Sequence, residues 1–163
     1  MYYSGRVKLN VFARGAYGIV KEVARHVLRR PVVGIAAAAH TSDDRWLLIR
    51  RSDSGEWALP GGTLEWGETL STAITRELGE EAGVDGARFG RLIGVYSAPE
   101  RDPRFHAVTV LVEAEIEPPR RAPHNPVEIL EVRLFPRAEL PRELSHGMTE
   151  MLADALSGGT RLE

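Results

Sequence analysis

Acidic side chains crowd one short stretch of this 163-residue chain. Positions 65 to 85 hold six carboxylates and one basic side chain, Arg76, and three of the acids stand close together: Glu77, Glu80 and Glu81. On a helix, Glu77 and Glu81 would lie one turn apart, and at roughly 6 Å with an effective dielectric constant near 20 they would repel each other by about 2–3 kcal/mol. Such an arrangement is costly unless a cation offsets the repulsion.

Carboxylates of this kind suit a hard divalent cation. Mg²⁺ usually combines a few carboxylates with water and substrate phosphate instead of filling a complete protein cage. Glu77, Glu80 and Glu81 would provide such an open shell for Mg²⁺ or Mn²⁺. The alternative is a solvated acidic helix, but the position of the acids beside the apolar face, the nearby Arg76 and the preceding glycine-rich loop favour the metal.

The helix that must position these acids is predicted between Thr69 and Gly83. Thr69 can cap the first turn, and Gly83 suits the left-handed residue that follows the last turn. Apolar side chains recur between them at intervals of three and four residues: Leu70, Ala73, Ile74, Leu78 and Ala82. At about 100° per residue, Glu77 and Glu81 border this apolar stripe instead of lying opposite it.

The spacing of these residues resembles the Nudix box, G-x5-E-x7-R-E-U-x-E-E-x-G-U, in which U is an aliphatic residue. Every specified position from Gly62 to Val84 is filled, and a chance match at one starting point is on the order of 10⁻¹⁰. The preceding run Trp57-Ala58-Leu59-Pro60-Gly61-Gly62 is also similar to the family. The resemblance implies the Nudix fold, an α/β/α sandwich around a mixed sheet within the α+β class.

The resemblance also implies a metal site. Nudix enzymes hydrolyse a nucleoside diphosphate linked to another moiety, by attack of water on phosphorus, and they use Mg²⁺ or Mn²⁺. Four positions of this chain match the metal-binding positions of the family: Gly62 (through a nearby backbone carbonyl), Glu77, Glu80 and Glu81.

The remaining catalytic roles are carried over in the same way. Arg76 is expected to orient a glutamate and Glu68 to shape the junction between the loop and the helix. Members of the family differ in their general base, so three glutamates are candidates here: Glu81, Glu128 and Glu131.

A shorter resemblance concerns the substrate. The run Tyr96 to His106, YSAPERDPRFH, is similar to the Y-S-x-P-x-R-D-P-R run of the bacterial and archaeal ADP-ribose pyrophosphatase branch. Arginines could clamp a phosphate and aromatic rings could stack on adenine. The candidate substrate-binding residues are Arg50, Arg51, Trp57, Tyr96, Pro99, Arg101 and Arg104. The alternative is a proline-rigidified turn with solvated arginines.

Three functions therefore remain open. The favoured one is hydrolysis of ADP-ribose or a related sugar nucleotide to a nucleoside monophosphate and a sugar phosphate. The second is hydrolysis of oxidised or non-standard nucleoside triphosphates. The third is a Nudix module that senses a nucleotide without cutting it, and the complete set of box glutamates argues against that function.

Composition narrows the class of protein. The length is typical of one domain, and the absence of cysteine excludes disulfides and zinc–thiolate sites. No apolar run approaches the roughly 18 residues of a membrane span. We expect a cytoplasmic protein that binds a small nucleotide and no membrane.

The net charge of −2 is unevenly distributed. Residues 1–31 hold seven Lys or Arg against one acid, so we divide the chain into a basic arm with an amphipathic helix, residues 1–31, and a Nudix hydrolase domain, residues 32–163. Nucleic-acid binding by the arm is not favoured, because no RNA- or DNA-binding module follows it. Its apolar helix face could instead pack on the sheet or on the partner in a homodimer.

Periodicity predicts the other elements. Strands are expected at 7–11, 32–39, 46–51, 91–97, 106–116 and 131–135, with a hairpin between the strands at 32–39 and 46–51. Helices are expected at 17–30 and at 145–156, where Ser145 would act as the cap.

Overall fold

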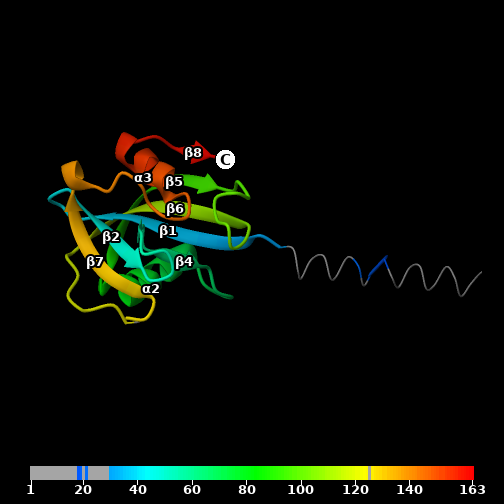
Figure 1. Ribbon diagram of the computed structural model, residues 1–163, viewed down its shortest axis with the longest axis horizontal. Helices are drawn as coiled ribbons and strands as arrows, with labels where there is room; N and C mark the ends of the chain where they lie inside the picture. Colours follow the sequence, from blue (N-terminus) through cyan, green and yellow to red (C-terminus); the bar gives the residue numbers. More distant parts are fainter. Residues whose placement is uncertain (1–17, 20, 22–29, 125) are drawn as a thin grey trace, which may run out of the picture. The chain divides into compact units, whose positions relative to one another are not determined.

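A computed structural model describes residues 30–124 and 126–163 of the chain, together with residues 18, 19 and 21 (Figure 1). The strand predicted at 7–11 and most of the helix predicted at 17–30 lie outside the described residues. The division of the chain at residue 31 stays a prediction.

A mixed sheet of eight strands forms the centre of the described domain. The strands are β1 (Val32–His40), β2 (Arg45–Arg51), β3 (Trp57–Ala58), β4 (Gly61–Thr63), β5 (Ala87–Tyr96), β6 (Ala107–Ile116), β7 (Ile129–Pro136) and β8 (Arg161–Leu162). Their order is β3-β2-β1-β6-β5-β8, with β4 paired to β1 and β7 paired to β2. The expected antiparallel pairing of β1 with β2 is confirmed at His40 and Trp46.

Strand β1 is buried on both faces of the sheet. It runs parallel to β6 over nine positions, from Val32 opposite Ala107 to His40 opposite Glu115. Its side chains alternate between two hydrophobic clusters, with Ala37 in one and Ala36 in the other. Small side chains suit a strand that is covered on both sides, because the covering elements can then approach the sheet closely.

The two helices cover opposite faces of the sheet (Figure 1). Helix α2 (Leu70–Ala82) adds Ile74 and Leu78 to one cluster, and helix α3 (Met148–Ser157) adds Met151 and Leu152 to the other. The expected α/β/α sandwich of the α+β class is therefore confirmed. Neither these two helices nor any other helical segment among the described residues is long and apolar enough to cross a membrane.

The predicted caps of α2 are confirmed. The side chain of Thr69 accepts a hydrogen bond from the backbone N–H of Thr72 at 3.2 Å. Gly83 adopts a left-handed backbone, with φ of 67°, and its N–H donates to the carbonyl of Gly79. These two ends fix which turn of the helix carries the acidic residues.

The start of the last helix was predicted wrongly. Helix α3 begins at Met148, and its cap is Gly147, not Ser145. His146 and Gly147 both have a left-handed backbone, with φ of 53° and 67°, so the helix cannot extend back through them. The Ser145 hydroxyl is hydrogen-bonded to Nδ1 of His146 at 2.8 Å.

The cap at Gly83 gives a stability prediction. A Cβ at this position would lie 2.1 Å from the Arg121 carbonyl oxygen on a left-handed backbone, so Gly83→Ala should lower the free energy of unfolding by about 2 kcal/mol or more in urea denaturation. Gly86→Ala is the matched control, because a Cβ there meets nothing within 4 Å, and it should change stability by less than about 0.5 kcal/mol. Equal effects of the two substitutions would contradict the proposed role of Gly83.

Candidate active site

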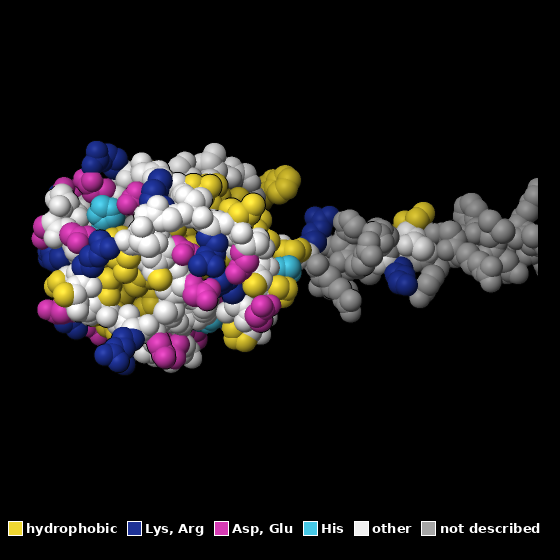
Figure 2. Space-filling model, turned by 90° about the horizontal axis from the view of Figure 1, so that it is seen from above, with side chains coloured by type: hydrophobic (Ala, Val, Ile, Leu, Met, Phe, Trp, Pro, Cys, Tyr) yellow, Lys and Arg dark blue, Asp and Glu magenta, His cyan; other side chains and the backbone are white. Residues whose placement is uncertain are grey.

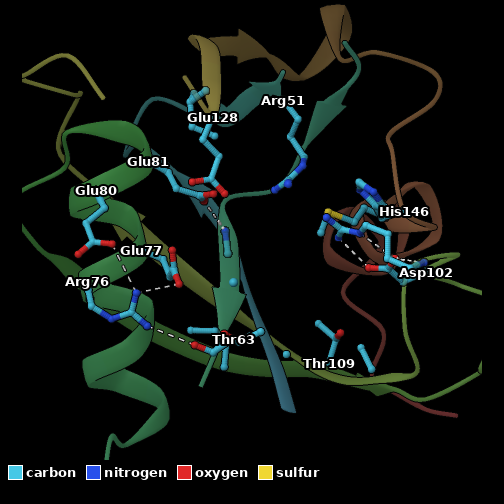
Figure 3. A pocket seen from close by; sticks show the side chains of 18 of the residues that line it. Arg51, Thr63, Arg76, Glu77, Glu80, Glu81, Asp102, Thr109, Glu128 and His146 are labelled. Carbon is cyan, nitrogen blue, oxygen red and sulfur yellow. Dashed lines mark hydrogen bonds and ion pairs between the residues drawn. The ribbon is translucent and has the colours of Figure 1, made fainter. Parts of the chain in front are cut away.

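A cavity of about 490 Å³ lies between α2 and the loops that follow β5 and precede α3 (Figure 3). Its α2 side carries Glu77, Glu80 and Glu81, and its opposite side carries Asp102 and His146. Arg104 also lines the cavity and is bonded to Asp102. Strand β4 forms the floor between the two sides with Gly61, Gly62 and Thr63. The cavity thus has an acidic helix on one side and a wall of mixed charge on the other.

Glu81 is the most deeply buried acid of the cavity, with 7% of its surface exposed. It accepts a hydrogen bond from the Gly61 N–H at 2.8 Å. Burial raises the pKa of Glu81 to about 8; the bond from Gly61 opposes this rise, and the charge of Glu77 adds to it. A carboxyl group in this position is thus uncharged over part of the neutral range unless a cation binds beside it.

Glu77 lies beside Glu81 and against the backbone of β4. A Cβ on Gly62 would come within 2.1 Å of the Glu77 carboxylate, so only glycine leaves room for this approach. Burial raises the pKa of Glu77 even though Arg76 donates a hydrogen bond to it at 2.8 Å. Gly61 is equally restricted, because its Cβ would lie 2.2 Å from the carbonyl oxygen of Ile35.

Arg76 joins the loop before α2 to the acidic face of the helix. Its Nε and Nη2 donate to Glu68 at 2.9 and 3.1 Å, and Nη2 also donates to the Thr63 carbonyl at 3.2 Å. Its Nη1 donates to Glu77 at 2.8 Å and lies 3.5 Å from Glu80. The Glu68 hydrogen bond, followed by that of Glu77, holds the pKa of Arg76 above its usual range. These contacts fit the orienting role expected for Arg76 and the shaping role expected for Glu68.

The donors at this site fit a hard divalent cation in type. Glu77 and Glu81 are two partly desolvated carboxylates whose charged forms are disfavoured, and the Cβ-free backbone of Gly61 and Gly62 lies against them. The Glu80 carboxylate is turned toward Arg76, and within the described ranges no three His, Asp or Glu side chains are grouped as metal ligands. The metal set of Gly62, Glu77, Glu80 and Glu81 stays a prediction.

Two arginines reach the cavity from the opposite side, each held by an aspartate. Arg51 donates to both oxygens of Asp53, at 3.0 and 2.9 Å, and this pairing lowers the pKa of Asp53 to about 2. Arg104 donates to both oxygens of Asp102, at 2.9 and 2.8 Å. The third nitrogen of Arg104, Nη1, lies 3.3 Å from Asp53, so the two pairs form one network.

Eight of the predicted site residues line the cavity: Arg51, Gly62, Arg76, Glu77, Glu80, Glu81, Arg104 and Glu128. In Figure 3, the carboxylate of Glu128 points toward that of Glu81, and Arg51 extends into the space beside them. The charge of Glu128 contributes to the raised pKa values of both Glu77 and Glu81. Of the candidate bases, Glu81 and Glu128 are thus the two that the fold brings together.

The structure places Glu131 and Arg50 away from the cavity. The two residues face each other across β7 and β2, and their charged groups lie 3.8 Å apart. The register of β2 and β7 shifts between Arg50 and Arg51, and of these two neighbours only Arg51 lines the cavity.

Four further residues of the predicted substrate site do not line the cavity. Tyr96 is 1% exposed, and its hydroxyl donates to Asp154 at 2.9 Å, so neither face of its ring is open to a base. Trp57 packs edge-on against Phe135, with ring centroids 4.9 Å apart. Pro99 lies within a turn closed by a bond from the Arg101 N–H to the Ala98 carbonyl.

Arg101 is the fourth of these residues, and we do not retain it as a phosphate clamp because, unlike Arg104, it does not line the cavity. All three guanidinium nitrogens are bonded within the protein: Nε to Glu163, Nη1 to the Gly147 carbonyl, and Nη2 to Glu150 and Glu163. The sequence could not show this, because Glu163 lies 62 positions further along the chain.

The structure adds residues that the sequence did not single out. Thr109 on β6 lies opposite Gly34 of β1 and lines the cavity, and a Cβ on Gly34 would come within 2.6 Å of the Thr109 hydroxyl. His146 is half-buried in the far wall. Burial and then the charge of Arg104 lower the pKa of His146. Strand alternation could have drawn attention to Thr109, but nothing in the local sequence marks His146.

Comparison with known proteins supports the resemblance of residues 62–84 to the Nudix box. The NUDIX domain family model matches residues 28–155. An ADP-ribose pyrophosphatase of Methanocaldococcus jannaschii is 44% identical over 72 residues, which are 42% of this chain and 42% of that protein. The aligned part of the chain thus spans less than half the length of this curated relative.

Two solved structures have similar folds. A MutT NUDIX hydrolase from Burkholderia pseudomallei is 29% identical, with a TM-score of 0.66, over 77% of this chain and 98% of that one. An ADP-ribose pyrophosphatase from Streptococcus suis is 26% identical, with a TM-score of 0.60, over 82% of this chain and 100% of that one. The similarity therefore extends well beyond the box.

The burial of Glu81 predicts a pH effect on stability in the presence of a chelator. Its pKa is raised from 4.5 to about 8 in the folded state, so its contribution favours folding below pH 4.5 and is lost as the pH rises from 4.5 to 8. The upper limit of this loss is about 5 kcal/mol. Denaturant unfolding from pH 5 to 8.5 should therefore show a smaller decline in Glu81→Gln than in the unmutated protein.

Glu80→Gln serves as the control, because it removes the same charge from an exposed position of the same helix. It should leave the decline unchanged. An identical pH profile for Glu81→Gln and the unmutated protein would contradict the account of Glu81.

Proposed function

This chain belongs to the NUDIX family, and on that premise we propose that it is a metal-dependent pyrophosphohydrolase. Its substrate would be a nucleoside diphosphate linked to another moiety, with ADP-ribose or a related sugar nucleotide favoured. The observation that carries the proposal is the pair of Glu81, which is buried, and Glu77, which is partly buried, in a cavity that Arg51 and Arg104 also line. Homodimer formation and a cytoplasmic location stay predictions.

The two sides of the cavity divide the work on a diphosphate. Mg²⁺ or Mn²⁺ held by Glu77, Glu81 and Glu80 would supply the positive charge that offsets the growing charge on the phosphate oxygens. Arg51 and Arg104 approach from the other side, and a guanidinium whose orientation an aspartate already fixes loses little freedom when it binds a phosphate.

Water that attacks phosphorus must give up a proton, and a carboxylate beside it can accept that proton. Glu128 and Glu81 lie together at the edge of the cavity (Figure 3). Because Glu81 is bonded to the Gly61 N–H and is a proposed metal ligand, we assign the role of general base to Glu128. Glu81 is the alternative base.

Two considerations support a sugar nucleotide as substrate. The run from Tyr96 to Arg104 is similar to the ADP-ribose pyrophosphatase branch, and two of the similar proteins carry that name. The similar fold of a MutT NUDIX hydrolase keeps nucleoside triphosphates as the alternative class. A nucleotide sensor without turnover is the second alternative.

Product analysis tests this proposal. The protein is incubated with Mg²⁺ or Mn²⁺ and a panel of ADP-ribose, sugar nucleotides, dinucleotides and oxidised dNTPs. We expect ADP-ribose to be the best substrate and to give AMP and ribose 5-phosphate. Preferred release of pyrophosphate from a triphosphate would overturn the substrate assignment, and no turnover with either metal would favour the sensor.

Variants of the two candidate bases complete the test. Glu128→Gln should lower kcat by about 10²–10⁴-fold, because an amide cannot accept the proton of water. Glu131→Gln is the control, since that side chain is paired with Arg50 outside the cavity, and it should keep kcat within about twofold. Full activity of Glu128→Gln would return the role of base to Glu81.

A further inference from the structure

Two chain segments form the cavity wall opposite α2, and the side chain of Arg101 connects them. Arg101 begins the first segment and donates from Nη1 to the Gly147 carbonyl in the second, at 3.0 Å. The first segment lines the cavity with Asp102, Arg104 and Phe105, and the second lines it with His146 and Met148. The two segments lie more than 40 positions apart in sequence, so this contact is one that joins them.

Arg101 is itself held by the carboxylate of Glu163, which follows β8. Glu163 accepts from Nε and Nη2 of Arg101 at 2.8 and 2.6 Å, and from the backbone N–H groups of Ser97 and Ala98 at 2.9 Å each. The hydrogen bonds from Arg101 and then from Ala98 lower the pKa of Glu163 to about 2. The Arg101 side chain is 13% exposed, and a shielded two-point pair of this kind holds its geometry better than a solvated pair does.

Further contacts between charged side chains lie around α3. Figure 2 views the domain from the side on which α3 and β8 lie in Figure 1, and there basic and acidic side chains are interspersed. Arg161 of β8 pairs with Asp154 of α3, which also accepts from the hydroxyl of Tyr96. The guanidinium of Arg101 lies over the ring of Tyr96, 5.1 Å from its centroid. The loop after β5 is thus held against β8 and α3 through Arg101 and Glu163.

The second segment needs such a contact because its backbone is strained. His146 adopts a left-handed conformation with φ of 53°, which a residue with a Cβ rarely adopts, and Gly147 follows with φ of 67°. Conformations of this kind persist only where surrounding contacts hold them. Ser145 holds the imidazole of His146 from one side, and Arg101 holds the carbonyl of Gly147 from the other.

We propose that Arg101, held by Glu163, is a positioning residue that fixes the substrate-binding wall opposite α2. The inference rests on the proposed function, and it gives Arg101 no contact with substrate. The fixed wall presents His146 and the pair of Arg104 with Asp102 to the part of the substrate remote from the acidic helix. Preorganising these groups lowers the cost of binding, and it acts on the bound substrate and the transition state alike.

Loss of this contact should therefore change KM and not kcat. Arg101→Gln and Glu163→Gln should each raise KM for the best substrate by about tenfold and keep kcat within about twofold, because Glu77 and Glu81 are held by other groups, Arg76 and the Gly61 N–H. The KM of the double variant should be no higher than that of either single variant, because both substitutions remove the same contact between Arg101 and Glu163. Glu150→Gln is the matched control: it also accepts from Arg101, but its side chain is 61% exposed, and it should leave KM within about twofold.

A direct role of Arg101 in phosphate binding predicts a different pattern. Removal of the Glu163 charge would then free the guanidinium, so Glu163→Gln would lower KM or leave it unchanged while Arg101→Gln raised it. That pattern, or additive effects of the two substitutions, would overturn the proposal.

Amide hydrogen exchange tests the same contact without turnover. Exchange in residues 97–106 and 145–148 should be about tenfold faster in Glu163→Gln than in the unmutated protein, with exchange in α2 unchanged. Unchanged exchange in either segment would overturn the proposal, even in an active enzyme. Faster exchange in a protein that turns over no substrate would instead support the contact and reject the proposed function.

A second variant covers the case in which Glu163→Gln unfolds. Arg101→Lys keeps the charge beside Glu163 but cannot donate to Glu163 and Gly147 together through a planar fork. The rate of amide exchange should then rise in residues 145–148, and it should rise less in residues 97–98, whose N–H groups still donate to Glu163. Equal exchange in Arg101→Lys and the unmutated protein would count against the proposal.

Discussion

The burial of the Glu81 carboxylate beside that of Glu77 is the constraint on which the rest of the site depends. Two acids that are shielded from water and adjacent on one helix face destabilise the fold unless something compensates for their charge. The Gly61 N–H meets one oxygen of Glu81, and Arg76 meets Glu77. Arg76 also binds Glu68 and the Thr63 carbonyl, so its charge is shared, and a divalent cation is the natural complement to the pair.

The two walls of the cavity are built differently. Helix α2 packs on the central sheet through a hydrophobic face, so its acids move only if the core moves. The opposite wall is made of loop segments and the end of β2, and it keeps its shape through paired charges: Arg51 with Asp53, Arg104 with Asp102, and Arg101 with Glu163. A rigid catalytic side and a wall set by side-chain contacts would allow substrate choice to change while the chemistry stays the same.

The sequence was sufficient to predict local features of the fold and the site. The period of Leu70, Ile74 and Leu78, the cap at Thr69 and the glycine at 83 defined α2, because each depends on residues within a few positions. Reliance on residue type alone also explains why the start of α3 was predicted wrongly. Ser145 is a favourable cap by residue type, but the left-handed turn at His146 and Gly147 moved the helix start to Met148.

Contacts between distant segments could not be predicted from residue type. Arg101 and Arg104 stand three positions apart in one motif and have the same side chain, but only Arg104 lines the cavity. What separates them is Glu163, whose position beside Arg101 depends on the pairing of β8 with β5. The burial of Tyr96 likewise involves a distant residue, since its hydroxyl donates to Asp154 of α3.

We propose that a divalent cation completes the pair of Glu77 and Glu81. Electron paramagnetic resonance of free Mn²⁺ during a titration tests it directly, because only the unbound ion gives the full solution signal. We expect the unmutated protein to bind Mn²⁺, Glu81→Gln to weaken binding by at least about tenfold, and Glu131→Gln to leave it unchanged. Equal Mn²⁺ affinity in the unmutated protein and in Glu81→Gln would contradict it.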